Sequence, residues 1–120
     1  MSESLLMTKS KEFALTVIRV CKELRSARCE SALINQFLRA GTSIGANIRE
    51  AQYAHGKADF VARLQIALKE ANETGYWLEL LFRTGYIDEN KYQELDIACT
   101  AIRVLLIHSI RTAKGETQSP

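Results

Sequence analysis

The centre of the chain reads Gly41-Thr-Ser-Ile-Gly-Ala-Asn-Ile-Arg-Glu-Ala51, and a second segment of the same kind reads Ile66-Ala-Leu-Lys-Glu-Ala-Asn-Glu-Thr-Gly-Tyr-Trp-Leu78. In both, small residues repeat at helical spacing within an apolar stripe, and polar residues lie along the edges of that stripe. A glycine inside a helix costs about 1 kcal/mol relative to alanine, so Gly41 and Gly45 require a compensating gain in packing. We therefore predict two helices in very close contact.

Apolar residues recur every three or four positions along four segments, which predicts four helices. The first is expected from about Lys9 to Arg25. Ser31 is the expected N-cap of the second helix, and Gly56 is expected to close it. The only proline is the last residue, Pro120, so nothing interrupts a nearly all-helical chain.

The third helix is expected to carry Asp59 in its first turn, where a carboxylate suits the unpaired amides, and to run to about Arg83. Gly85 should end it, and Asp88 should cap the fourth helix. The predicted core faces of the four helices are Phe13, Val17, Cys21 and Leu24; Ile34, Phe37, Leu38, Gly41, Ile44, Gly45 and Ile48; Phe60, Leu64, Ala67, Ala71, Gly75, Leu78 and Phe82; and Tyr92, Leu95, Cys99, Ile102, Leu106 and Ile110.

Short connections between helices favour antiparallel neighbours, so the expected fold is all-α, an antiparallel up-down-up-down four-helix bundle. We expect an N-terminal tail over residues 1–8, the bundle over residues 9–113 and a disordered C-terminal tail over residues 114–120. That last segment has no large apolar residue to bury.

The overall composition is that of a soluble globular domain. The chain has 120 residues, of which 47% are hydrophobic and 25% charged, and its formal net charge of +2 does not by itself indicate a nucleic-acid-binding protein. Three cysteines are too few and too scattered for a disulfide framework, so free thiols in a reducing cytoplasm are expected. Neither a leader peptide nor a run long enough to span a membrane is evident.

The third and fourth helices each have a second apolar stripe, which a monomeric bundle does not require. An aligned set of apolar residues that includes an aromatic side chain is typical of an interface, which predicts a homo-oligomer. The alternative is an apolar but monomeric surface. The predicted interface residues are Ile66, Trp77, Leu80, Ile97, Ala101, Val104 and His108.

Read together, these segments resemble the four-helix bundle family that includes the 23S rRNA-intervening-sequence proteins. The resemblance covers roughly residues 13–110 and is strongest over residues 39–51, 57–60 and 66–78. A Ser-Ile-x-x-Asn-Ile-x-Glu pattern is met by Ser43, Ile44, Asn47, Ile48 and Glu50. Arg49 departs from the acidic or apolar residue that many members carry at its position.

The resemblance implies an antiparallel bundle that assembles into a ring-shaped homopentamer. It also implies a relation to the accessory variability determinant proteins of diversity-generating retroelements, which associate with a reverse transcriptase and with nucleic acid through basic surface. Most other members have no established biochemical role. RNA, DNA and a protein partner such as a reverse transcriptase are therefore all candidate partners.

Basic side chains are the candidate nucleic-acid-binding residues. Repetition of small basic clusters around an oligomer would build a phosphate-binding surface that a charge of +2 per chain conceals. The alternative is a solvated mixed-charge face, since Glu12, Glu23 and Glu50 lie nearby. The candidates are Lys11, Lys22, Arg25, Arg28, Arg39 and Arg49.

A group of polar residues, Asn47, Glu50, Glu70, Asn72 and Glu73, is predicted to form a structural hydrogen-bonded network between the second and third helices or between subunits. A metal site is disfavoured, because the Glu-x-x-His pairs of di-iron bundles are absent. Trp77 is expected to pack at an interface, although an exposed indole can also stack on a base. Cys29 is expected to be the one exposed thiol, with only Arg28 beside it to favour the thiolate.

The sequence therefore predicts a cytoplasmic, non-enzymatic bundle without cofactors that serves as a binding or scaffolding module, preferably for RNA or an RNA–protein complex. Two alternatives remain open. One is a protein-binding adaptor that does not bind nucleic acid. The other is a magnesium-dependent nucleotide hydrolase that uses Glu50, Glu70 and Glu73.

Overall fold

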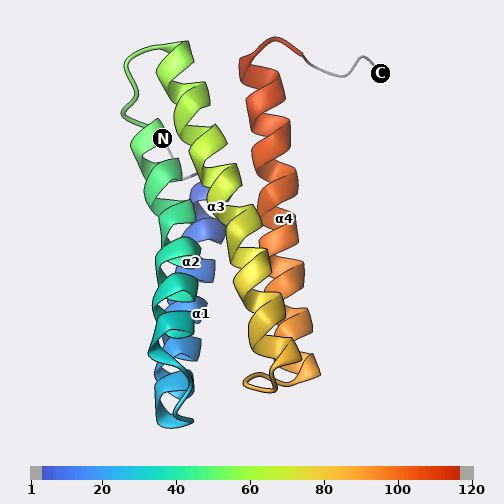
Figure 1. The fold of residues 1–120 in the computed structure, drawn as a ribbon. Helices are drawn as coiled ribbons and strands as arrows, with labels where there is room; N and C mark the ends of the chain where they lie inside the picture. Colours follow the sequence, from blue (N-terminus) through green and yellow to red (C-terminus); the bar gives the residue numbers. More distant parts are fainter. Residues whose placement is uncertain (1–3, 117–120) are drawn as a thin grey trace.

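The computed structural model describes residues 4–116, and every regular element within that range is an α-helix. The helices are α1 (Leu5–Ser26), α2 (Ser31–Ala51), α3 (Lys57–Arg83) and α4 (Glu89–Ala113). Each runs antiparallel to the helix before it (Figure 1). The predicted all-α, up-down-up-down four-helix bundle is confirmed.

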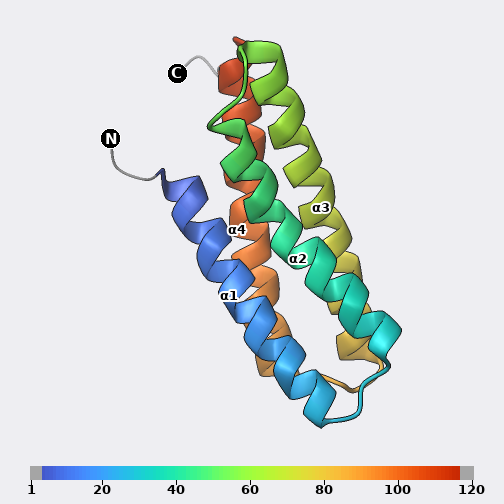
Figure 2. The same cartoon turned by 90° about the vertical axis from the view of Figure 1, so that its left-hand side faces the viewer.

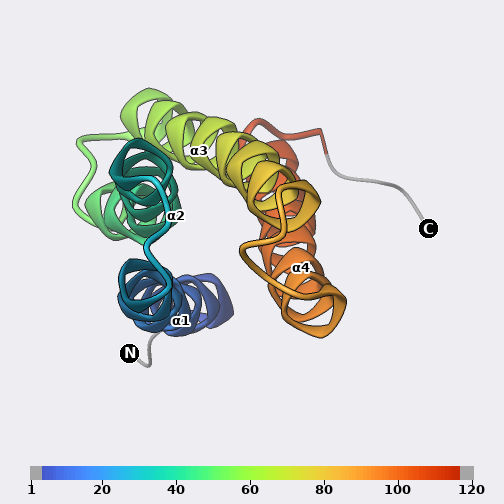
Figure 3. The same ribbon diagram turned by 60° about the horizontal axis from the view of Figure 1, so that its bottom comes forward.

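The helices pack in chain order, α1 on α2, α2 on α3 and α3 on α4. Contact between α1 and α4, which would close the bundle, is the weakest of the four helix pairs. In a view tilted toward one end of the bundle, the four helices are arranged along an open curve that starts with α1 and finishes with α4 (Figure 3). A view from the side shows α1 and α2 running past each other along most of the length of α1 (Figure 2).

The start of α1 differs from the expected tail over residues 1–8. Ser4 is the N-cap, and its hydroxyl accepts a hydrogen bond from the Met7 amide at 3.1 Å, so the helix begins at Leu5. Leu6 is buried in the core, which adds a packing reason for this earlier start. At the other end, α4 stops at Ala113, as predicted, while residues 117–120 of the expected disordered tail lie outside the described range.

The ends of α2 were predicted incorrectly. Glu30 occupies the N-cap position without a side-chain cap, and Ser31 is already helical. The chain leaves α1 through Arg28, whose φ of 60° is left-handed, and the Cys29 amide bonds to the Leu24 carbonyl at 2.9 Å. Because this turn is short, α2 begins at Ser31, directly after Glu30. Gly56, with φ of 94°, starts α3 and does not close α2, which ends at Ala51.

The junction between α3 and α4 agrees with the prediction. Gly85 adopts a φ of 85° just past the end of α3, and the Tyr86 amide bonds to the Leu81 carbonyl at 2.9 Å. This is the reversed turn that glycine favours at helix C-termini. Asp88 then caps α4 by accepting a hydrogen bond from the Lys91 amide at 2.8 Å.

The core is apolar and continuous along the bundle. The largest fully buried side chains include Phe37, Ile44, Leu78 and Leu106, one or more from each of α2, α3 and α4. Ser10 and Thr74 are the buried polar residues among residues 4–116, and each hydroxyl bonds to a carbonyl of its own helix. The predicted core faces are confirmed in the main. The exceptions are partly buried residues at the margins of these faces, namely Leu38, Gly45, Phe60, Gly75, Phe82 and Tyr92.

Close approach of α1 to α2 depends on the glycines of α2. A Cβ atom built on Gly41 would lie 2.9 Å from both Cγ atoms of Val17, a distance that real Cβ atoms essentially never show. At Gly45 the same construction meets the carbonyl and hydroxyl oxygens of Ser10 at 3.4 Å. The helix that the glycines of α2 allow to approach closely is therefore α1, and Gly41 is the tighter of the two positions. The second predicted segment, on α3, shows no such approach at its glycine, because a Cβ atom on Gly75 would meet nothing within 4 Å.

Candidate functional site

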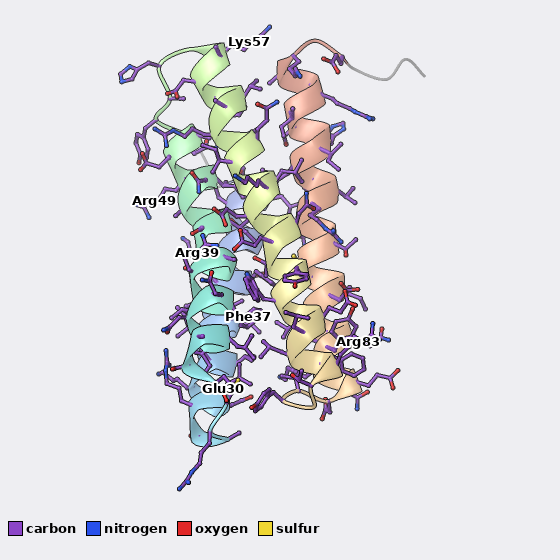
Figure 4. The ribbon with its side chains drawn as sticks, viewed as in Figure 1. Glu30, Phe37, Arg39, Arg49, Lys57 and Arg83 are labelled. Carbon is purple, nitrogen blue, oxygen red and sulfur yellow. The ribbon has the colours of Figure 1, made fainter. Side chains whose placement is uncertain are left out.

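An arginine clasp joins α2 to α3 on the outer surface of the bundle. Arg39 on α2 donates to Glu70 Oε1 on α3 at 3.1 Å, and its second terminal nitrogen pairs with Glu73 Oε2. The two glutamates are one helical turn apart, so one guanidinium reaches both. Figure 4 shows Arg39 on the length of α2 that faces α3.

Trp77 completes the arginine clasp. Its indole Nε1 donates to Glu73 Oε2 at 3.1 Å, and its ring is partly buried against the core. The hydrogen bond from Trp77, together with the pairing to Arg39, holds the pKa of Glu73 below its ordinary value against the opposing effect of partial burial. Glu73 is therefore a charged acceptor fixed by two donors.

The predicted polar network is present in part. Glu70 and Glu73 connect α3 to α2, but their partner is Arg39 and not Asn47, whose side-chain amide donates to the Ser43 carbonyl of its own helix at 2.8 Å. Asn72 lies on the other side of α3, where Arg103 of α4 approaches its amide oxygen at 3.5 Å. Glu50 is exposed, and its carboxylate makes no hydrogen bond or ion pair within residues 4–116, although its backbone carbonyl accepts from the Tyr53 amide.

The acidic residues of this surface do not form a metal centre. Within residues 4–116, no three His, Cys, Asp or Glu side chains are grouped so that they could hold a metal ion. Arg39 also occupies the space between Glu70 and Glu73 with a positive charge that repels a cation. The arginine clasp is thus an ion-paired and hydrogen-bonded cluster.

A shallow groove on a different face lies between α1 and α2. It has a volume of about 200 Å³, and its lining is mostly apolar. Lys11 of α1 and Arg49 of α2 line this groove, and Gly45 contributes no side chain to fill it. The lining residues are Met7, Ser10, Lys11, Ala14, Thr42, Gly45, Ala46 and Arg49.

The groove continues into a basic surface along α1. Lys22, Arg25 and Arg28 are exposed, and none of them forms an ion pair within the described residues. Arg49 is likewise exposed and without an ion pair in that range, and Figure 4 shows it directed away from the bundle. Of the six candidate nucleic-acid-binding residues, only Arg39 is separated from this basic face, because the arginine clasp holds it at the α2–α3 boundary.

The second apolar stripe is most exposed on α4. Ile97 and Val104 are 66% and 61% exposed, and Ala101 and His108 lie on the same side of the helix. Ile66 on α3 is also exposed, whereas Trp77 and Leu80 are partly buried within the single chain. The seven predicted interface residues therefore divide into an open set on α4 and a more covered set on α3.

The cysteines are poor candidates for chemistry. All three are free and buried, which corrects the expectation that Cys29 is exposed. Cys29 is covered because the tight turn after α1 brings its backbone amide back onto Leu24. Burial raises the pKa of Cys21 and of Cys29, and it raises the pKa of Cys99 to about 11, so the reactive thiolate is disfavoured at neutral pH.

No helix within residues 4–116 is both long and apolar enough to cross a bilayer. The main features of the surface are an arginine clasp, a basic face with an apolar groove and an apolar stripe on α4. The basic face and the stripe were predicted from the sequence. The role of Arg39 was not, because a single sequence does not show which glutamates lie opposite an arginine on another helix.

Comparison with known proteins identifies relatives of this architecture. A crystal structure of a protein with unknown function from the S23 ribosomal protein family of Bacteroides thetaiotaomicron VPI-5482 is 50% identical, with a TM-score of 0.87. The match covers 89% of this chain and 99% of that one. No curated protein matches. The family model for the 23S rRNA-intervening sequence protein matches residues 3–108, nearly the whole bundle. The chain therefore belongs to the 23S rRNA-intervening sequence protein family.

Proposed function

We propose that this protein is a non-enzymatic, self-associating binding module whose partner is nucleic acid. The observation that carries the proposal is the basic face of α1 and α2, defined as Lys11, Lys22, Arg25, Arg28 and Arg49. Lys11 and Arg49 line one groove, and the other three extend along α1 to the following turn. At 1.5 Å per residue, Lys11 and Arg25 are about 21 Å apart along the helix axis.

On α1, the acidic residues lie beside this face and not on it. On α1, Glu12 lines a second groove that faces α4, and Glu23 lies on that same side of the helix at a spacing of 11 residues. Because phosphates repel carboxylates, this separation of the two signs of charge on α1 favours contact with a polyanion. In an assembly of several copies, the basic face would be repeated, and the summed field would exceed that of one chain with charge +2.

Self-association is the second part of the proposal, and its support is the stripe of Ile97, Ala101, Val104 and His108 on α4, of which Ile97, Val104 and His108 are exposed. Two large β-branched side chains that are more than 60% exposed are a feature that a protein interface would bury. The family resemblance implies a pentamer. Val104→Glu should lower the mass measured by multi-angle light scattering, because an unpaired buried charge opposes association. An unchanged mass would remove this stripe from the interface.

Binding is tested by fluorescence anisotropy with labelled single-stranded RNA and duplex DNA at several salt concentrations. We expect affinity to fall with salt, with a logarithmic slope of about 0.7 per phosphate contacted on a single strand and about 0.9 on duplex DNA. The double variant Lys22→Ala/Arg49→Ala should weaken binding and reduce that slope. The control, Lys57→Ala/Lys69→Ala, removes the same charge from α3 and should bind like the parent.

Equal losses in the two double variants would indicate a general charge effect and would contradict the assignment of the basic face. Absence of binding at low salt would overturn the nucleic-acid proposal. The module would then be better described as a protein-binding adaptor. Magnesium titration with a panel of nucleotides should give neither heat nor turnover, because Arg39 occupies the position between Glu70 and Glu73 that a metal would need.

A further inference from the structure

Tyr53 is the most exposed large hydrophobic side chain within residues 4–116, at 72%. It follows the end of α2, and its amide bonds to the Glu50 carbonyl at 3.1 Å, so the chain makes a further turn at this end of the helix. Tyr53 therefore lies close to Arg49, which is in the last turn of α2. Its ring contacts no other aromatic ring within that range, whereas the exposed Tyr76 packs edge-on against Trp77 at 5.1 Å.

Apolar side chains also alternate with the cations on α1. Leu15 and Ile18 are exposed and lie between Lys11 and Lys22 in sequence. Spacings of four, three and four residues keep these four positions in one sector of the helix. The basic face is thus a series of positive charges with uncovered hydrophobic groups between them.

We infer that the nucleic acid bound by this face is single-stranded, and that Tyr53 stacks on an unpaired base while Arg49 holds the adjoining phosphate. The inference rests on the proposed function and names the class of its ligand. Base–aromatic stacking beside cations is the common device of proteins that bind single strands. Leu15 and Ile18 supply further apolar surface for bases that are not paired.

A duplex would not use these groups. Its bases are stacked inside the helix, and its outer surface is a dense row of phosphates. Contact with a duplex would place Leu15 and Ile18 against that charged backbone and would leave the Tyr53 ring without a base. Groove readout would instead need hydrogen-bonding side chains on an inserted helix, and apolar residues occupy the middle of this face.

The experiment compares a labelled single-stranded RNA of about 12 nucleotides, a length within the site sizes of known single-strand-binding domains, with the same sequence as a duplex. Tyr53→Ala should weaken single-strand binding about five-fold or more, because stacking on one base is lost. Tyr53→Phe keeps the ring and should bind like the parent. The matched control is Tyr76→Ala, which removes an exposed tyrosine from α3. Circular dichroism confirms the fold of each variant.

A loss confined to Tyr53→Ala and to the single strand supports the inference. Equal affinity for the single strand and the duplex would overturn the inference. So would unchanged binding by Tyr53→Ala if Lys22→Ala/Arg49→Ala still binds weakly. Either result leaves the proposed function intact. If the parent protein binds neither probe at low salt, the inference and the proposed function fail together.

Discussion

The two sides of α1 pack in opposite ways. Against α2 the helix is so close that Gly41 has no room for a methyl group beside Val17. Against α4 the contact is the weakest in the bundle, and a groove of about 220 Å³ remains between Thr16 and Ala98. A four-helix bundle can therefore be held by three close pairs in chain order, and its closing pair can stay loose. Weak contact between α1 and α4 is tolerated because the three close pairs already cover the apolar core.

The largest expected effect comes from filling the close side. Gly41→Ala should lower the free energy of unfolding by up to about 2 kcal/mol, because overpacking costs about 1–3 kcal/mol and the gain in helix propensity returns only about 1 kcal/mol. Urea denaturation measures the change. Adding Val17→Ala should make Gly41→Ala less harmful in a double-mutant cycle. Independent effects of the two substitutions would show that the Gly41–Val17 contact is not limiting.

The same substitution at a glycine without neighbours sharpens the comparison. A Cβ atom at Gly75 of α3 meets nothing within 4 Å, so Gly75→Ala should raise the free energy of unfolding by about 1 kcal/mol. The opposite signs at Gly41 and Gly75 would isolate the steric term, since both glycines lie inside helices. Destabilisation by Gly75→Ala would mean that another subunit approaches this position.

The arginine clasp should contribute less, because it lies at the surface. Arg39→Ala should cost up to about 1 kcal/mol, which is the range of exposed ion pairs. Since the pKa of Glu73 is lower in the folded state than its ordinary value of 4.5, the stabilisation is present above pH 4.5. It is lost as the pH falls through the folded-state value. Glu73→Gln should therefore flatten the acid limb of stability against pH, and an unchanged acid limb would contradict this role.

The smallest effect is expected on the loose side of α1. Ala98→Leu extends into the groove between α1 and α4, so the free energy of unfolding should change by less than about 0.5 kcal/mol. Urea denaturation should be measured for Ala98→Leu and Gly41→Ala together. Both substitutions add apolar volume against α1, the first from α4 and the second from α2. A loss as large as that at Gly41 would show that the two sides are equally close in solution.

Much of the fold was predictable from local patterns. Core faces, the end of α3 at Gly85 and the cap at Asp88 depend on residues within a turn or two of each other, so periodicity and capping preferences reveal them. The start of α2 was missed because it depends on how the preceding turn closes, through a left-handed φ at Arg28 that is unusual for arginine. The end of α2 was missed because a glycine such as Gly56 can either end one helix or precede the next.

The candidate site was less predictable than the fold. The sequence pointed to Lys22, Arg25 and Arg49 through their spacing on single helices, and to an outer stripe on α4 in the same way. It did not separate Arg39 from the other basic residues, and it gave no reason to choose Tyr53 over the other tyrosines. The exposure and the ion pairing of a side chain depend on the neighbouring helix. A helical wheel describes one helix and carries no information about its neighbours.

By itself, the sequence determined four helices and their buried faces, because these follow from interactions between residues near one another in the chain. Gly41 and Gly45 also indicated that some other helix approaches α2 closely, because a glycine inside a helix requires a compensating gain in packing. Only the tertiary structure decided which helix Gly41 approaches, which glutamates hold Arg39 and which side of α1 stays open. These depend on the order and tilt of helix packing, where residues such as Arg39 and Glu70, 31 positions apart, come within hydrogen-bonding distance.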